Sequence, residues 1–507
     1  MSPVKFPAPA YNKNARSASE RVRAKLNHPV VDADGHTIEV EAVFFDYLKQ
    51  VGGANLVQRY ADMVEARGHS AWYKQSPQQL KDRRVQRPSY WFVPSRTTTD
   101  RATAMIPGVF RSRMDEFGID YSIVFPTISH LFVEISDDEL RPAICRAANV
   151  MNADLLSGHK DRLAPVAVIP LVTPEEGIRE LEYAVNELGI KVISIQGNVR
   201  RPIADRGDKA QGMTRGGLSY WIDNLALDSM YDYDPFWRRC VELGVAPACH
   251  SGSIGWANRT SISSFVYNHI GHFANQHEAV AKAMLLGGVT NRFPQLRMAY
   301  LEGGIAWAIS LYHSIIEHYE KRNVEALETN LNPGNIDRDE LVKLIRQHGG
   351  KAYESHLEEI RQGEGPFLQQ WAMKPEPDSF DEFALSQLKS KKDIKRKFAD
   401  RFYFGCEADD KTVPWAFKPE LNSGATFHPM LGSDIGHFDV TDPTECIAEA
   451  HELVEEGHLN EDQFKAYVFD NVVSLHGHAN PNFFKGTVVE DAAAKVLAAQ
   501  KSAIAAE

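Results

Sequence analysis

Residues 28–36 read His-Pro-Val-Val-Asp-Ala-Asp-Gly-His, a short apolar run that ends in polar residues at alternate positions. The apolar run at 29–33 predicts a buried strand, and side chains alternate between the two faces of a strand. Asp32, Asp34 and His36 therefore share one face at the carboxyl end of this strand. Three polar side chains on one buried face are costly unless something binds them. This end of the strand is predicted to be part of a functional site.

Seven further apolar runs follow, and near-continuous apolar runs are typical of parallel strands that are covered on both faces. They lie at 119–125, 163–171, 190–195, 244–249, 297–301, 401–405 and 430–433. Helical patterns separate them at 138–158, 174–188, 235–243, 275–287, 305–322 and 444–456. Eight strands that alternate with helices predict an α/β fold, the (β/α)8 TIM barrel. The competing fold is an open doubly wound sheet, but no Gly-rich turn follows the first strand to support a dinucleotide site.

The barrel pattern divides the chain into four segments. They are an N-terminal tail (1–28), strands one to six (29–322), a helical insertion between strands six and seven (323–400), and strands seven and eight with C-terminal helices (401–507). Residues 37–118 are long for one β–α connection and rich in Arg and aromatic residues, so they predict a lid or substrate loop. The charged insertion predicts a helical cap or an oligomer contact.

Composition limits the class of protein. The 507 residues are 43% apolar and 24% charged, which is ordinary for a soluble globular protein. A net charge of −12 argues against nucleic acid as a partner. The five cysteines are odd in number and include no CxxC pair, which indicates reduced thiols. No apolar run has the length of a signal peptide or a membrane span. We therefore expect a cytoplasmic enzyme with a small-molecule substrate, no membrane contact and a homo-oligomeric state.

Other strand ends carry polar residues as well. His250 follows strand five, Glu302 follows strand six, and Asp434 follows strand eight. In a barrel these ends meet Asp34 and His36 at the carboxyl-terminal face, where active sites of this fold lie. His and carboxylate ligands without Cys suit a divalent ion such as Zn, Mn or Fe. We predict one or two such ions, with Zn first, and the alternative is a purely structural polar cluster.

Further candidates lie in loops. Among the clustered His269, His272 and His277, we expect His272 to face the barrel mouth and to be catalytic. His437 is a candidate substrate contact, with a loop histidine that binds the backbone as the alternative. Substrate binding is also predicted for three residues of the 37–118 segment, since Arg clamps carboxylates and an aromatic ring packs on acyl or aromatic groups. These residues are Arg87, Trp91 and Arg96. The alternative is a surface loop that packs on the barrel rim.

The motifs resemble the amidohydrolase superfamily, in the branch that includes aminocarboxymuconate-semialdehyde decarboxylase and γ-resorcylate decarboxylase. The shared features are Asp-x-His on strand one, His after strand five and Asp on strand eight, with the phrases GGVTNRFPQLRMAYLEGGIAW (287–307), FGCEADD (404–410) and GSDIGHFD (432–439). The resemblance covers roughly 29–325 and 400–485. It implies that Asp34, His36, His250 and Asp434 are metal ligands. It also implies that Asp434 contacts the attacking water or the substrate.

Two positions depart from that branch. Glu302 stands where the decarboxylases carry a catalytic His in an HGG segment. Where many binuclear amidohydrolases have a carbamylated Lys on strand four, this chain reads Ile195-Gln196-Gly197. We therefore expect no carbamate-bridged pair of metals. Glu302 can instead bridge a second metal or act as a general acid or base.

These residues favour a metal-dependent hydrolase that cleaves an amide, ester, thioester or lactone. The ion would lower the pKa of a bound water toward ~7 and polarise the carbonyl. Asp434 is the first choice as general base, and Glu302 is the second metal ligand or proton shuttle. The main alternative is a metal-dependent non-oxidative decarboxylase of an aromatic or unsaturated acid, which Glu302 in place of His disfavours. Further alternatives are a dinuclear-metal oxygenase and a non-catalytic partner subunit.

Overall fold

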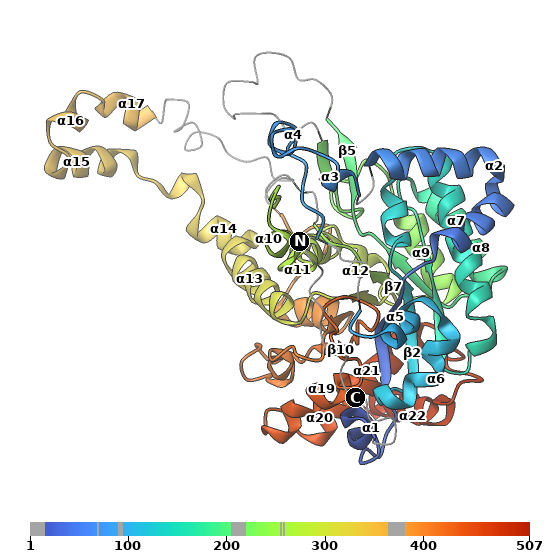
Figure 1. The fold of residues 1–507 in the computed structure, drawn as a ribbon. Helices are drawn as coiled ribbons and strands as arrows, with labels where there is room; N and C mark the ends of the chain where they lie inside the picture. Colours follow the sequence, from blue (N-terminus) through green and yellow to red (C-terminus); the bar gives the residue numbers. More distant parts are fainter. Residues whose placement is uncertain are drawn as a thin grey trace. The chain divides into compact units, whose positions relative to one another are not determined.

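The computed structural model describes residues 16–67, 70–89, 95–203, 220–253, 256, 259–362 and 381–506. The chain forms two compact units. Figure 1 colours the chain along its sequence, from blue at the N-terminus to red at the C-terminus. The barrel unit comprises Met1–Leu311 and Lys395–Glu507. The helical unit comprises Tyr312–Ile394.

Eight parallel strands of the barrel unit form one sheet in the order β1-β2-β3-β4-β7-β8-β9-β10. Their bounds are β1 (Val31–Thr37), β2 (Tyr121–Pro126), β3 (Leu163–Val168), β4 (Val192–Ile195), β7 (Pro247–Cys249), β8 (Met298–Tyr300), β9 (Phe402–Cys406) and β10 (His428–Leu431). Each predicted apolar run overlaps one of these strands, and the predicted TIM barrel is confirmed. An antiparallel hairpin, β5 (Val199–Pro202) with β6 (Tyr220–Asp223), follows β4 and was not predicted.

Backbone hydrogen bonds beyond the end of β10 close the barrel against β1. The N–H of Asp434 donates to the carbonyl of Asp34 at 2.9 Å, and the N–H of His36 donates to the carbonyl of Ile435 at 3.0 Å. The closure therefore runs through residues predicted to bind metal, so the two strand ends are fixed relative to each other.

Asp32 strengthens the same closure. Its carboxylate accepts hydrogen bonds from the Ser122 hydroxyl of β2 at 2.6 Å and from the Ser433 hydroxyl beyond β10 at 2.8 Å. It also accepts the backbone N–H of Ser433 at 2.8 Å. These hydrogen bonds lower the pKa of Asp32, but burial has the larger effect and raises it to about 6. Asp32 therefore joins β1 to both neighbouring strands, while Asp34 and His36 lie at the mouth.

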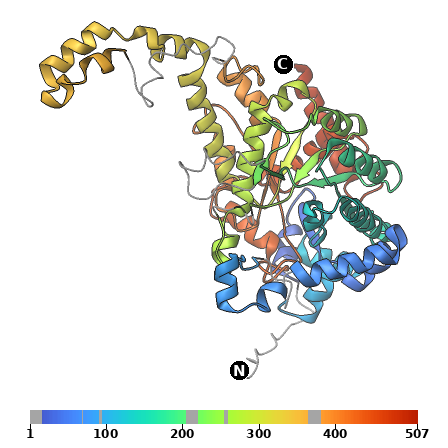
Figure 2. The same cartoon turned by 90° about the horizontal axis from the view of Figure 1, so that it is seen from above.

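Helices separate the strands, and Figure 2 shows them on the outer side of the sheet. The predicted helices are present within a few residues of their expected bounds. They are α7 (Leu140–Leu155), α8 (Pro174–Asn186), α9 (Asp234–Leu243), α11 (His272–Leu286), α13 (Ala306–Arg322) and α19 (Cys446–Glu455). Short helices α10 (Phe265–His269) and α12 (Val289–Arg292) flank α11, and α20 (Glu461–Lys465), α21 (Asn471–Ala479) and α22 (Glu490–Ala506) end the chain.

The segment after β1 is helical rather than a simple loop. It contains α2 (Glu41–Arg67), α3 (Ser70–Tyr73), α4 (Pro77–Arg83), α5 (Thr98–Met105) and α6 (Pro107–Phe117). Phe44 and Tyr60 of α2 pack in one apolar cluster with Phe132 and with Ile144 of α7. Burial of such aromatic side chains stabilises the fold by roughly 1.5–3 kcal/mol each. The start of this segment is therefore part of the packed barrel unit.

Residues before β1 are anchored as well. Helix α1 (Ala18–Arg23) contains the buried Ser19, whose N–H donates to the carbonyl of Thr444 at 3.1 Å. The Ser19 hydroxyl accepts the N–H of Ile447 at 3.0 Å. Residues 16–28, predicted as part of a tail, thus include a helix that is hydrogen-bonded to the segment around α19.

Most of the described residues of the helical unit are exposed, and many of them are charged. Its helices after α13 are α14 (Val324–Asn330), α15 (Arg338–His348), α16 (Lys351–Glu354), α17 (Leu357–Gln362) and α18 (Lys391–Ile394). Ion pairs within the unit join Arg322 to Glu382 at 2.5 Å and Arg361 to Asp339 at 2.7 Å. A cap or oligomer contact stays a prediction for this unit. Across the described residues, no helix combines the length and apolar character that a bilayer crossing requires.

Candidate metal centre

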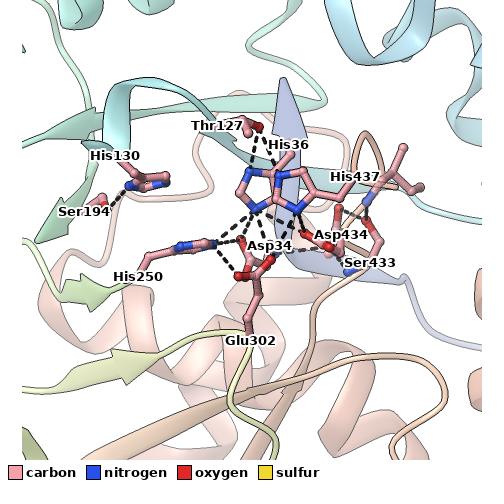
Figure 3. A network of polar contacts seen from close by, with 12 residues as sticks. Asp34, His36, Thr127, His130, Ser194, His250, Glu302, Ser433, Asp434 and His437 are labelled. Atoms are coloured by element: carbon pink, nitrogen blue, oxygen red, sulfur yellow. Dashed lines mark hydrogen bonds and ion pairs between the residues drawn. The ribbon is translucent and has the colours of Figure 1, made fainter. Parts of the chain in front are cut away.

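The structure brings the five predicted metal ligands together at the carboxyl-terminal end of the barrel (Figure 3). β1 supplies Asp34 and His36, and β7 ends directly before His250. Glu302 lies two residues beyond β8, and Asp434 three residues beyond β10. Their side chains are at most 5% exposed. The convergence follows from the parallel strands, because all their carboxyl ends lie on one face of a barrel.

Four of these side chains place one donor atom each in a tight group. His36 Nε2 lies 3.1 Å from His250 Nε2, 3.3 Å from Asp34 Oδ1 and 3.3 Å from Asp434 Oδ1. His250 Nε2 lies 3.1 Å from Asp34 Oδ1. Tetrahedral ligands about 2.0–2.2 Å from a zinc ion lie about 3.3–3.6 Å from one another. These separations are close to this spacing, so Asp34, His36 and His250 fit one divalent ion, and Asp434 Oδ1 lies at a similar distance from His36.

Glu302 and His437 stand beside this group. The two Glu302 oxygens lie 3.9 Å from His36 Nε2 and 4.0 Å from His250 Nε2. His437 Nδ1 lies 3.3 Å from Glu302 Oε1 and 2.6 Å from Asp434 Oδ1. The His437 ring also lies over the His36 ring, with 3.9 Å between centroids. His437, predicted as a substrate contact, therefore touches three of the predicted metal ligands directly.

Among the described residues, two further overlapping sets of side chains offer donor atoms that lie within 4.8 Å of one another. One set is His36, His130 and His250, and the other is His36, Glu302, Asp434 and His437. Sequence reasoning missed His130, which lies on the turn η1 (Ser129–Glu134) after β2. The only signal in the sequence is a histidine four residues beyond a strand end, which is too common to indicate a ligand.

Several buried carboxylate oxygens of the cluster accept no hydrogen bond. They are Asp34 Oδ2, Glu302 Oε2 and Asp434 Oδ2. A buried acceptor without a donor costs about 1–3 kcal/mol, and more when it is charged. A divalent cation offsets this cost, so these residues fit a metal better than they fit a self-contained polar cluster.

The electrostatics of the cluster also suit a cation. Burial opposes ionisation of Glu302, but His250 and His437 outweigh it and hold the pKa of Glu302 well below its ordinary value. Burial lowers the pKa of His250, yet Asp34 and Glu302 raise it to about 9. Burial and the nearby Glu302 raise the pKa of Asp434 well above its ordinary value. A bound cation would take the place of the protons that Asp434 and His250 otherwise hold.

The backbone is strained at two of the carboxylates. Glu302 has φ of 56° and Asp434 has φ of 50°, both in the left-handed region. Such a conformation costs a non-glycine residue roughly 1–3 kcal/mol and is common at functional sites. The N–H groups of Leu301 and Gly304 donate to neighbouring strands on either side of Glu302, at 3.1 and 3.0 Å. The sheet thus holds the carboxylate in its strained position.

Three cavities border the cluster or β1. One, of about 420 Å³, is lined by Glu302, His437 and His272 among others. A second, of about 340 Å³, is lined by His437, Arg96 and other residues. The largest, of about 1080 Å³, begins at residues 38 and 39, directly after β1, and is mostly apolar. The first two provide space for a small molecule beside the cluster.

The remaining residues that were predicted to be catalytic or to bind substrate lie in different surroundings. His272 lines the first cavity, and neither of its ring nitrogens has a hydrogen-bond partner. Burial lowers its pKa to about 3, so the ring is neutral. Arg87 is bound to a loop instead, since its guanidinium donates to the carbonyl of Ser263 at 3.1 Å. Arg96 is paired with Asp442, and Trp91 lies outside the described residues.

A family model described as Amidohydrolase matches residues 66–329, which is 264 of the 507 residues. The chain belongs to the amidohydrolase family. Membership in the amidohydrolase family confirms the predicted resemblance and the prediction of an enzyme, and it does not confirm hydrolysis. Together with the donor sets, it also supports the predicted divalent metal, without showing that the metal is zinc. The search of curated proteins finds no match.

Three solved structures are similar to this chain at low sequence identity. An amidohydrolase from Mycobacterium avium subsp. paratuberculosis is 15% identical over 89% of this chain and 98% of its own, with a TM-score of 0.49. A dihydroxybenzoic acid decarboxylase from a Polaromonas species was solved with bound manganese and the inhibitor 2-nitroresorcinol. It is 15% identical over 89% of this chain and 97% of its own, with a TM-score of 0.48. A 5-carboxyvanillate decarboxylase from Sphingomonas paucimobilis is 14% identical over 88% of this chain and 98% of its own, with a TM-score of 0.47.

Proposed function

We propose that this chain is a metal-dependent hydrolase that acts on the carbonyl group of a small amide, ester, thioester or lactone. The observation that carries the proposal is the position of Glu302. Its carboxylate stands about 4 Å from His36 and His250 and also lines the cavity of about 420 Å³. A carboxylate between a metal site and a substrate cavity can accept the proton of an attacking water.

Asp34, His36, His250 and Asp434 would hold a divalent cation, with Glu302 beside them. We propose zinc first, and manganese or iron also suit histidine and carboxylate donors without a thiolate. Bound there, the cation would supply Lewis acidity, which lowers the pKa of water beside it and polarises a carbonyl group.

We assign proton transfer to Glu302 and metal binding to Asp434. Asp434 was the first choice as general base, but it lines none of the three cavities, and its Oδ1 lies 2.6 Å from His437 Nδ1. Glu302 Oε2 is free of hydrogen bonds and can accept a proton. His437 lies 3.3 Å from Glu302 and can pass that proton to the leaving group.

The neutral His272 lines the same cavity and can orient the substrate there. Both of its ring nitrogens lack partners, so one can donate a hydrogen bond and the other can accept one. A buried ring without partners costs free energy, which a hydrogen bond to a bound substrate would recover.

Decarboxylation is the second candidate, and His437 is the observation that favours it. In decarboxylation the bond from the ring or alkene carbon to the carboxylate breaks, CO2 leaves, and a proton takes its place on carbon. Sequence reasoning disfavoured this reaction because Glu302 replaces a histidine. His437, 3.3 Å from Glu302, nevertheless brings an imidazole to the same wall of the cavity. An aromatic acid would use this ring as its proton donor.

A substrate panel separates the two reactions. The full-length protein, loaded with zinc, manganese or ferrous iron, is incubated with small amides, esters, thioesters and lactones and with hydroxybenzoates. Released acid and CO2 are both measured. We expect hydrolysis of at least one acyl compound and no CO2 release. CO2 release from a hydroxybenzoate, with no hydrolysis of any acyl compound, would reject the hydrolase and favour the decarboxylase.

A further inference from the structure

The cavity of about 420 Å³ beside the metal centre is lined by several carboxylates and by no described lysine or arginine. The carboxylates are those of Glu302, Glu407, Asp409, Asp410 and Asp439. All five lie beyond the carboxyl-terminal ends of strands, three of them directly after β9. The cavity therefore presents an excess of negative charge to a molecule that enters it.

Three of these side chains have no partner in the part of the chain that the structure describes. Glu407, Asp409 and Asp439 are bound there by neither a hydrogen bond nor an ion pair. Asp410 differs from them, because it accepts the N–H and the hydroxyl of Thr412 at 2.8 and 2.6 Å. Asp410 is thus held by the chain, and the other three are available to a ligand.

The positive side chains nearby are bound elsewhere. Lys411 follows Asp410 in the sequence, but its ammonium group pairs with Glu452 at 3.0 Å. The guanidinium of Arg259 donates to two backbone carbonyls of the segment just before α11, at 2.5 and 2.7 Å. Neither side chain lines the cavity. A positive charge beside the three carboxylates must therefore come from a bound molecule or ion.

The pKa of Glu407 reflects the same shortage of positive charge. Burial has the largest effect, and the carboxylates of Asp439, Glu302 and Asp409 add to it, so that this pKa is raised to about 9. A carboxyl group that keeps its proton near neutral pH marks a place where a positive charge is favourable.

An organic cation suits this wall of the cavity better than a second metal ion. Among the described residues, no set of close metal-donor atoms includes Glu407, Asp409 or Asp439. Two aromatic side chains, Phe273 and Phe438, line the same cavity. Carboxylates bind an ammonium group, and aromatic rings attract a cation and pack on its alkyl chain.

His272 gives an independent sign that a molecule binds here. It lines the cavity and is 2% exposed, yet neither of its ring nitrogens has a hydrogen-bond partner. A buried polar atom without a partner is costly. The polar atoms of an amide or ester that enters the cavity can supply the partner.

We propose that this cavity selects substrates that carry an alkylammonium group near the reacting carbonyl. The ammonium group would lie against Glu407, Asp409 and Asp439, and the carbonyl would lie beside Glu302. The use of the cavity for substrate rests on the proposed function, but the selection of charge is a property of binding alone. Because the same carboxylates repel an anionic acid, the proposal also weighs against decarboxylation.

The test compares γ-aminobutyramide with pentanamide, which has the same length and a terminal methyl group in place of the ammonium group. Binding to the full-length, metal-loaded protein is measured by ligand-observed NMR at neutral pH and low salt, which also detects any hydrolysis. We expect the cation to bind at least about 10-fold more tightly. Added salt should reduce this preference, because it screens the charges.

Two substitutions locate the effect in the cavity. Glu407→Gln and Asp439→Asn should each weaken the binding of γ-aminobutyramide, and together by at least about 10-fold, with pentanamide unchanged. Glu187→Gln is the matched control. It removes one negative charge from an exposed residue that ends α8 and precedes β4, at the end of the barrel opposite to the cavity. This control should keep the wild-type preference.

Equal affinities of the wild type for the two amides, or no detectable binding of either, would overturn the proposal. An undiminished preference in the double variant would also overturn it. Asp439 is exposed, so Asp439→Asn should fold and decides alone if Glu407→Gln does not. A preference for the cation without hydrolysis of any acyl compound rejects only the proposed reaction. Hydrolysis of neutral acyl compounds with equal affinities for the two amides rejects only the selection of charge.

Discussion

The variant His250→Ala is expected to lose its bound metal and at least roughly 10³-fold in kcat/KM on the substrate that the wild type uses. A divalent cation contributes several kcal/mol to catalysis, and 1.36 kcal/mol corresponds to a factor of ten. His250 Nε2 is central to the donor group, 3.1 Å from both Asp34 Oδ1 and His36 Nε2. Metal per chain is measured by elemental analysis, and secondary structure is measured by circular dichroism.

His428→Ala provides a matched control, because His428 also belongs to a barrel strand. It is the first residue of β10 and stacks on Tyr403, at the end of the barrel opposite to the cluster. This variant should keep its metal and its turnover. Full metal content and full activity in His250→Ala would show that the cluster has been assigned wrongly.

Glu302→Gln is expected to lower kcat by about 10²–10⁴-fold, the range typical of losing a positioned general base. Glutamine keeps the shape of the side chain but cannot accept a proton from water. If Glu302 acts mainly in the transition state, KM should change little. Steady-state kinetics on a hydrolysed panel substrate, with metal content measured in parallel, separates a loss of proton transfer from a loss of metal.

Glu182→Gln controls for the removal of one negative charge. Glu182 is a partly exposed residue that pairs with Arg239, and exposed pairs contribute about 0–1 kcal/mol to stability. We expect wild-type kinetics for this control. Glu302→His adds a second comparison, since it should not restore hydrolysis. Wild-type kcat in Glu302→Gln would remove Glu302 from the mechanism.

The barrel and five of the clustered residues could be predicted from the sequence for one physical reason. Parallel strands covered by helices are continuously apolar, and polar residues directly after them must lie on one face of the barrel. Asp34, His36, His250, Glu302 and Asp434 all satisfy this rule. The rule predicts that these residues are near one another, but it does not assign their roles.

Other parts of the site depend on contacts that the sequence pattern does not reveal. His130 lies on a turn beyond β2, and its partner Ser194 is 64 residues away on β4. His437 was expected to contact substrate, yet the turn after β10 places its ring against Asp434 and over His36. Asp32 shares the strand face of Asp34, but hydrogen bonds to neighbouring strands occupy it. Long-range hydrogen bonds of this kind leave no periodic signal in a sequence.

The most direct test of the metal centre is to count the metal in protein purified without added metal, and then to remove and restore it. We expect at least one divalent ion per chain, loss of turnover after chelation, and recovery on addition of zinc, manganese or ferrous iron. The protein should also unfold at a higher temperature with metal than without, because the ion binds only the folded cluster. Full turnover by protein that retains no metal would contradict the account.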